Sequence, residues 1–138
     1  MLSVLNTDEQ MAQILKNAHV IAIVGYSNDP SRASYRIGQY LERMEYTVYP
    51  VNPTIEEVNG NRSYPTLADV PEQVDIVNVF RRPQYLRGIV EEAIAIGAPV
   101  VWAQLGVADK EAARIGSEAG VTVIMNRCIK VEHARLVR

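Results

Sequence analysis

The sequence of 138 residues contains a single cysteine, and this scarcity removes two classes of structure. One cysteine cannot form an internal disulfide, and it cannot supply the several thiolates of a cysteine-based zinc site. The two histidines and the acidic residues also lack the spacing of metal ligands. We therefore expect no resident metal. The low cysteine content suits a reducing compartment and predicts a cytoplasmic protein.

Long hydrophobic runs and a large excess of charge of either sign are missing as well. The apolar runs reach only strand length, so no segment is expected to span a bilayer. Residues 1–10 are acidic, whereas a signal peptide would be basic and then apolar. The formal net charge of -2 gives no general reason to bind nucleic acid or an acidic membrane. We expect one domain over residues 1–138, with neither nucleic acid nor a membrane as partner.

The stretch from His19 to Ser34 joins an apolar, β-branched strand to a glycine, a polar turn and the start of a helix. A strand that is apolar at nearly every position is buried on both faces, as central parallel strands are. Gly25 permits a sharp turn, and Ser34 is expected to cap the helix that follows, Tyr35 to Met44. Free backbone N–H groups and the positive helix end would then attract a phosphate.

Strands and helices alternate along the whole chain, with no internal repeat and no linker. Strands are expected at residues 20–24, 47–51, 74–80, 100–103 and 121–125. Helices are expected at residues 7–18, 35–44, 83–97 and 109–119. The pattern predicts an α/β fold in three layers, with a doubly wound (Rossmann-like) parallel sheet of about five strands in the order 3-2-1-4-5.

Two segments carry no strong periodic pattern. Residues 53–74 are expected to form a loop with a helical turn or two and a short strand near residues 62–64. The residues after 128 are expected to form a short basic tail.

Ligands of doubly wound sheets bind at the carboxyl ends of the strands. In this sequence those ends carry Gly25, Tyr26, Ser27, Asn52, Pro53, Phe80, Arg81, Arg82, Gln104, Leu105, Gly106, Asn126, Arg127 and Cys128. Three of these residues are arginines, and Arg32 lies nearby in the first loop. Any one of them alone is best interpreted as a solvated surface charge. Their gathering at one edge of a slightly acidic protein predicts a site for an anion.

NAD is the weaker candidate for that anion, because the required glycines are missing. The dinucleotide fingerprint is Gly-x-Gly-x-x-Gly, and after Gly25 its two later glycine positions hold Ser27 and Pro30. The acidic residue that would bind a ribose hydroxyl after the second strand is also absent, and Asn52-Pro53 stands in its place.

Several separated motifs follow one another in order: residues 25–27 with 32–35, then 49–53, 64–71, 79–83, 102–107 and 127–135. Through these motifs the chain from Ala18 onward resembles the CoA-binding Rossmann domain proteins. More distantly, it is similar to the CoA-binding domain of the succinyl-CoA ligase α subunit and of ADP-forming acyl-CoA ligases. The resemblance implies that coenzyme A, or an acyl-CoA, lies along the strand ends.

The resemblance also implies a place for each part of the ligand. The backbone of residues 25–27 would hold the pyrophosphate, with Arg32 nearby. Asn52-Pro53 and Phe80-Arg81-Arg82 would flank the adenosine and its 3′-phosphate, and residues 104–106 and 126–128 would border the pantetheine arm. This chain lacks the glycine- and lysine-bearing turn of the ligases and their domain with a phosphorylated histidine. The ligase reaction therefore does not transfer.

The leading hypothesis is a module that binds coenzyme A or an acyl-CoA without turnover, with no catalytic residue assigned. The alternative is an enzyme or enzyme subunit, either an acyl-CoA ligase or transferase fragment or an NAD(P)-dependent oxidoreductase. A third hypothesis is an interaction protein with a vestigial pocket. A homo-oligomer or a larger acyl-CoA enzyme is a possible partner. His19 and His133 are interpreted as structural, and Cys128 as a packing residue near the site.

Two expectations concern single residues. Gly25→Val is expected to abolish ligand binding while the domain still folds, because the added side chain would block the pyrophosphate. Strand alternation points successive side chains to opposite faces, so only one of Arg81 and Arg82 is expected to face the ligand.

Overall fold

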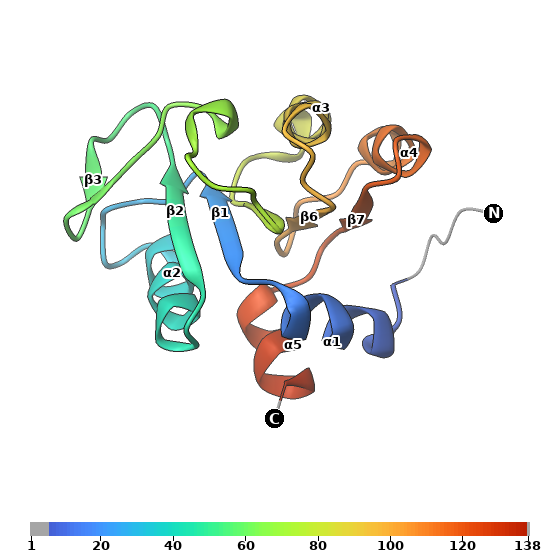
Figure 1. The fold of residues 1–138 in the computed structure, drawn as a ribbon, viewed down its shortest axis with the longest axis horizontal. Helices are drawn as coiled ribbons and strands as arrows, with labels where there is room; N and C mark the ends of the chain where they lie inside the picture. The colour runs from blue at the N-terminus through green and yellow to red at the C-terminus, as the bar shows by residue number, and fades with distance from the viewer. Residues whose placement is uncertain (1–5, 138) are drawn as a thin grey trace.

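The computed structural model describes residues 6–137, and its centre is a parallel sheet of five strands (Figure 1). The strands are β1 (Val20–Val24), β2 (Thr47–Val51), β5 (Ile76–Val79), β6 (Val100–Ala103) and β7 (Thr122–Ile124). All four pairings between neighbouring strands are parallel. The predicted α/β class and parallel, doubly wound sheet are confirmed.

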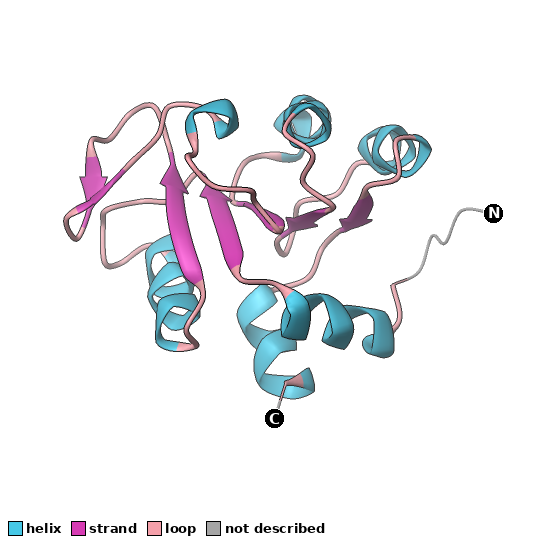
Figure 2. Ribbon diagram, in the orientation of Figure 1, coloured by secondary structure: helices cyan, strands magenta, loops and turns pink. Residues whose placement is uncertain are grey.

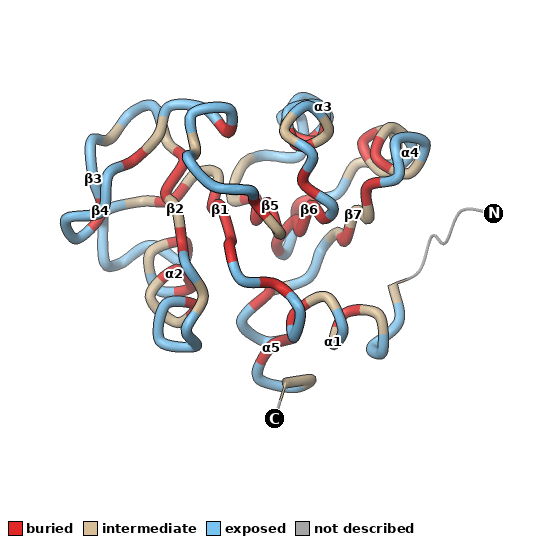
Figure 3. The backbone as a smooth tube through the Cα atoms, in the orientation of Figure 1, coloured by how far each residue is buried: buried red, intermediate tan, exposed pale blue. Residues whose placement is uncertain are grey.

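Helices cover both faces of the sheet (Figures 1 and 2). One face is covered by α1 (Asp8–Asn17), α2 (Ala33–Arg43) and α5 (Ile129–Leu136), whose apolar side chains join one buried cluster with alternate residues of the strands. The other face is covered by α3 (Leu86–Ala95) and α4 (Lys110–Glu118), which pack on a second cluster. Figure 3 shows the strands as the most continuously buried part of the chain.

The sheet order is β2-β1-β5-β6-β7, so the predicted order 3-2-1-4-5 is wrong. The third long strand, β5, pairs with β1 and does not lie outside β2. Asp75 fixes this pairing, because its Oδ2 accepts hydrogen bonds from the backbone N–H groups of His19 and Val20 at 2.8 and 2.9 Å. The right-handed crossover rule fixes the face on which a connection lies, and leaves open the direction in which the sheet grows.

The connection between β2 and β5 occupies the outer edge of β2. It forms the hairpin β3 (Glu57–Val58) and β4 (Asn61–Arg62), and then the 3-10 helix η1 (Leu67–Asp69). Tyr64 exchanges backbone hydrogen bonds with Pro50 and Asn52 at 2.9 Å each. The outer edge of β2, where the predicted order put the third strand, is therefore already paired with the segment at Tyr64.

Two local predictions are corrected by the structure. Arg32 is the N-cap of α2, whereas Ser34 lies inside the helix, where its Oγ accepts a hydrogen bond from the N–H of Ser27 at 3.0 Å. The expected basic tail is the helix α5. The positive residues of α5 hide its helical pattern in the sequence, although its apolar residue Ile129 is completely buried.

Helices α1 and α5, the first and last described helices, are joined by an ion pair. The guanidinium of Arg135 contacts both carboxylate oxygens of Asp8, at 2.7 and 2.8 Å. The same guanidinium also contacts the buried carboxylate of Glu132. Within residues 6–137, every helix is too short or too polar to cross a lipid bilayer.

A partly buried cluster of aromatic rings fixes α5 against α2. The hydroxyl of Tyr40 lies 2.8 Å from Nδ1 of His133, and the rings of Tyr40 and Tyr46 both meet the imidazole edge-on. The ammonium of Lys130 lies 5.4 Å from the centre of the Tyr40 ring. His133 is 6% exposed, and burial lowers its pKa below the usual value.

His133 is expected to make the stability of the fold depend on pH. Its pKa is lower in the folded protein, so the unfolded chain binds the proton more readily, and the free energy of unfolding should fall as the pH drops below about 6.5. Urea unfolding at pH 7.5 and pH 5.5 measures the effect. His133→Gln should unfold with a smaller difference between the two pH values than the wild type. The exposed His19→Gln is the matched control, and equal pH dependence in all three proteins would contradict the expectation.

Candidate functional site

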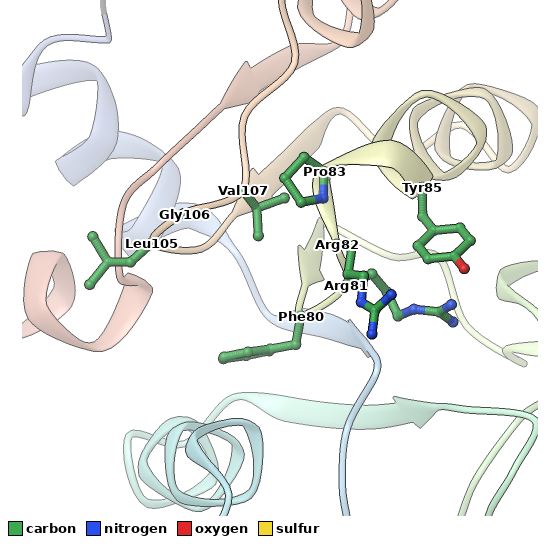
Figure 4. Close-up of a pocket in the computed structure, with 8 residues that line it drawn as sticks. All are labelled: Phe80, Arg81, Arg82, Pro83, Tyr85, Leu105, Gly106 and Val107. Carbon is green, nitrogen blue, oxygen red and sulfur yellow. The ribbon is translucent and has the colours of Figure 1, made fainter.

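A hollow of about 600 Å³ opens at the carboxyl ends of β5 and β6. Its lining comes from two segments, which follow these strands directly (Figure 4). The lining residues are Phe80, Arg81, Arg82, Pro83, Tyr85, Leu105, Gly106 and Val107. Five of the residues that the sequence singled out therefore meet at one place.

Both arginines of the Arg81-Arg82 pair line the hollow. The guanidinium of Arg81 lies over the ring of Tyr85, 4.3 Å from its centre, which holds this cation in place. Arg82 is exposed to solvent. Strand alternation does not separate the two side chains, because β5 ends at Val79 and both arginines lie beyond it. Figure 4 shows both on the Tyr85 side of the strand end.

The Gly25 turn packs closely against the backbone of two neighbouring strand ends. Gly25 has a φ of +88°, and a Cβ atom at this position would lie 2.4 Å from the carbonyl oxygen of Phe80. Its N–H donates to the carbonyl of Val51 at 2.9 Å. Any side chain at position 25 would therefore press on the backbone after β5. Gly25→Val is therefore expected to strain the fold as well, so a loss of ligand binding in this variant would not by itself place the pyrophosphate at the turn.

The polar residues around this turn bind one another. The ring of Tyr26 is completely buried, and its hydroxyl accepts a hydrogen bond from Gln39 at 3.1 Å. Asn52 donates from Nδ2 to the carbonyl of Tyr26 at 2.9 Å, while its Oδ1 accepts from Thr54. The side chains of Tyr26, Asn52 and Ser34 thus hold the strand ends in position.

The first turn of α2 is left without a side-chain cap. Arg32 at the N-cap makes no capping hydrogen bond, and the first turn holds no acidic residue. The leading N–H groups of a helix have no partner within the helix, so they are available to an acceptor from outside. Arg32 itself is exposed, as is Pro53 at the end of β2.

A polar chain inside the protein links β5, β6 and α5. Gln104 donates from Nε2 to Oδ1 of Asn78, and its Oε1 accepts from the N–H of Ile129 at 3.2 Å. Both amide side chains are buried, and Nδ2 of Asn78 is the one buried side-chain nitrogen or oxygen among residues 6–137 that lacks a partner. Both polar groups of the Gln104 side chain are therefore bonded within the protein. Sequence reasoning missed Asn78, although one amide within the apolar run of β5 is a visible signal.

The loop after β7 supports the wall of the hollow. Asn126 has a φ of +58°, and its Oδ1 accepts a hydrogen bond from the N–H of Gly106 at 2.8 Å. Cys128 is the N-cap of α5 and is partly buried. Neither residue lines the hollow itself. The same holds for Gly25, Tyr26, Ser27, Arg32, Ser34, Asn52, Pro53 and Gln104. Sequence reasoning missed three lining residues, Pro83, Tyr85 and Val107.

Among residues 6–137, the structure holds no group of three or more His, Cys, Asp and Glu side chains that could bind a metal ion. The charged groups of the hollow are its two arginines. The arrangement is suited to bind an anion and brings no acid–base pair to the hollow.

The parallel sheet, with helices on both faces, places the protein in the class of Rossmann-like α/β domains. The chain belongs to the CoA binding domain family, whose sequence profile matches residues 19–134. The resemblance drawn from the separated motifs is thereby confirmed.

Three relatives illustrate the range of the family. The chain is 42% identical over 125 residues to the uncharacterized protein YneT of Bacillus subtilis, with 91% of this chain and 93% of that protein covered. A solved structure of a hypothetical protein from Pyrococcus horikoshii OT3 has a TM-score of 0.93 at 39% identity, with 100% of both chains covered. The α subunit of ADP-forming acetate–CoA ligase II from Pyrococcus furiosus is 28% identical over 133 residues. That match covers 87% of this chain and 29% of the subunit.

The contact between Gly25 and Phe80 predicts a large cost for the smallest possible side chain. Gly25→Ala should lose more stability than Gly60→Ala, since both positions have a positive φ and a Cβ at Gly60 would meet nothing within 4 Å. Gly60→Ala should cost about 1–2 kcal/mol for the backbone conformation alone. Urea unfolding of both variants measures the difference in stability. Equal losses of stability would show that the Phe80 carbonyl moves aside without an energetic penalty.

Proposed function

We propose that the protein binds coenzyme A or an acyl-CoA at the carboxyl edge of its sheet, without turning it over. Membership of the CoA binding domain family supports this ligand. The observation that carries the proposal is the meeting of Arg81, Arg82 and Tyr85 around one hollow at that edge. A nucleotide that bears several phosphates needs cations there, and an aromatic ring beside a cation suits a purine.

The parts of the ligand are assigned by the chemistry of each wall. The two arginines face the phosphates, and the ordered guanidinium of Arg81 reduces the entropy lost on binding. The uncapped first turn of α2, with Arg32 at its N-cap, offers N–H groups to the pyrophosphate. The turn at residues 104–107 borders the pantetheine arm. In this proposal Asn52, Ser34 and Gln104 act by positioning the backbone, because their side chains are bonded within the protein.

An enzyme subunit is the second candidate, and one observation favours it. In the acetate–CoA ligase relative, the part that matches this chain makes up 29% of a longer subunit. For this protein, a separate partner chain could supply the parts of an enzyme that the rest of the ligase subunit supplies in the relative. Copurification of a larger acyl-CoA enzyme with the tagged protein, and turnover of an acyl-CoA by that complex alone, would favour this candidate over the isolated binding module.

Isothermal titration with coenzyme A, dephospho-CoA, NAD and ATP tests the proposed ligand. Coenzyme A should bind more tightly than each of the other three, because only coenzyme A and its thioesters combine the 3′-phosphate with the pantetheine arm. Tighter binding of NAD than of coenzyme A would overturn the proposal. The absence of binding by any of the four at millimolar concentration would favour an interaction protein with a vestigial pocket.

Arg81→Ala and Arg82→Ala should each weaken the binding of coenzyme A. A contact from a guanidinium to a phosphate contributes about 1.5–3 kcal/mol, which is roughly tenfold to a hundredfold in Kd. The arginine that contacts the 3′-phosphate should affect dephospho-CoA much less than coenzyme A. Its loss should also flatten the dependence of binding on salt.

Arg43→Ala is the matched control, because Arg43 ends α2 and does not line the hollow. It should leave the Kd within about twofold of the wild type, a change too small for a lost charged contact. If neither Arg81→Ala nor Arg82→Ala differs from this control, the arginines are surface charge and the hollow is not the nucleotide site.

A further inference from the structure

Exposed apolar side chains concentrate at the hollow. Among residues 6–137, the large apolar side chains that stay exposed are Met44, Tyr85, Leu105 and Val131. Two of these four, Tyr85 and Leu105, line the hollow, and Leu105 is the most exposed, at 68%. Single exposed leucines are common on protein surfaces. This leucine lines the hollow together with three other apolar residues, Phe80, Pro83 and Val107.

The exposure of Leu105 is fixed by the backbone. Leu105 and Gly106 are the central residues of a turn, which the N–H of Val107 closes by donating to the carbonyl of Gln104 at 2.9 Å. Gly106 has a φ of +81°, and Asn126 holds its N–H at 2.8 Å. The leucine therefore cannot fold back onto the core without breaking these contacts. Its apolar surface stays exposed at the edge of the hollow.

The hollow has two chemically different sides. Figure 4 shows the side chains of Phe80 and Leu105 directed to one side, and those of Arg81 and Arg82 directed to the other, toward Tyr85. The partly buried thiol of Cys128 lies on the loop that supports the wall carrying Leu105. This arrangement favours a ligand that is anionic at one end and apolar at the other.

We propose that the preferred ligand is an acyl thioester of coenzyme A with a saturated acyl chain, and that Leu105 and Phe80 contact this chain. The inference rests on the proposed function and deepens it, because it distinguishes the thioester from the free thiol. The arginines bind the phosphates at the far end of the ligand. The acyl chain then covers apolar surface that would otherwise stay in water.

The apolar contact predicts a graded preference. Each methylene of the acyl chain that leaves water on binding should tighten the Kd by up to about fourfold. In the series acetyl-CoA, butanoyl-CoA and hexanoyl-CoA, the affinity should therefore rise with chain length. Free coenzyme A should bind more weakly than butanoyl-CoA.

Isothermal titration of the full chain with these four compounds tests the proposal, with Leu105→Ser as the variant. The substitution should reduce the ratio of the Kd for acetyl-CoA to that for hexanoyl-CoA toward one. The turn at residues 104–107 also borders the pantetheine arm, which all four compounds share, so any change in the Kd for free coenzyme A should appear as a common factor that cancels in this ratio. Val131→Ser, which removes an exposed apolar side chain outside the hollow, is the matched control and should keep the wild-type ratio.

The outcomes separate the two proposals. If coenzyme A binds but chain length has no effect on the Kd, the acyl site is wrong and the proposed function stands. An unchanged ratio in Leu105→Ser would also overturn the acyl site. If Leu105→Ser instead dissociates a dimer in sedimentation experiments and leaves the ratio unchanged, Leu105 serves a contact between copies. If none of the four compounds binds, the proposed function and the acyl site both fail.

Discussion

Gly25 lies so close to the end of β5 that a Cβ atom would stand 2.4 Å from the carbonyl oxygen of Phe80. This close approach brings the turn after β1 and the segment after β5 together. The N–H of Gly25 is bonded to Val51 at the end of β2, so three strand ends meet at one residue. The residues that follow β5, including both arginines, start from this junction. Their placement therefore depends on a position that only glycine fills without strain.

Around this junction the polar side chains fall into two groups. Asn52, Ser34 and Gln104 find their hydrogen-bond partners within the protein and make the backbone rigid. Arg81 and Arg82 keep their charges at the hollow, with Arg81 ordered by an aromatic ring. A rigid edge with ordered cations loses little conformational entropy when an anion binds. The first group thus supports the second, although sequence reasoning gave both groups the same role.

The difference between what could and could not be predicted has a physical basis. Local patterns located β1, β2 and β6 at their observed bounds, because hydrophobic runs and turn residues act over short distances. The sheet order depends on contacts far apart in the sequence, such as that between Asp75 and Val20. Strand ends named five of the eight residues that line the hollow. Tyr85 was missed because it lies in the 3-10 helix η2 (Pro83–Tyr85), beyond the strand end itself.

The ion pair between Asp8 and Arg135 holds the first and last described helices side by side. Chains whose two ends lie close together tolerate circular permutation. A short linker could join the chain near Asp8 to the chain near Arg135, and the exposed turn at Asn59-Gly60 offers a place to open it, far in sequence from the segments that form the hollow. The elements could thus follow one another in a different order along the polypeptide and still form the same sheet edge. The same closeness would let the domain be inserted as a unit into a longer chain.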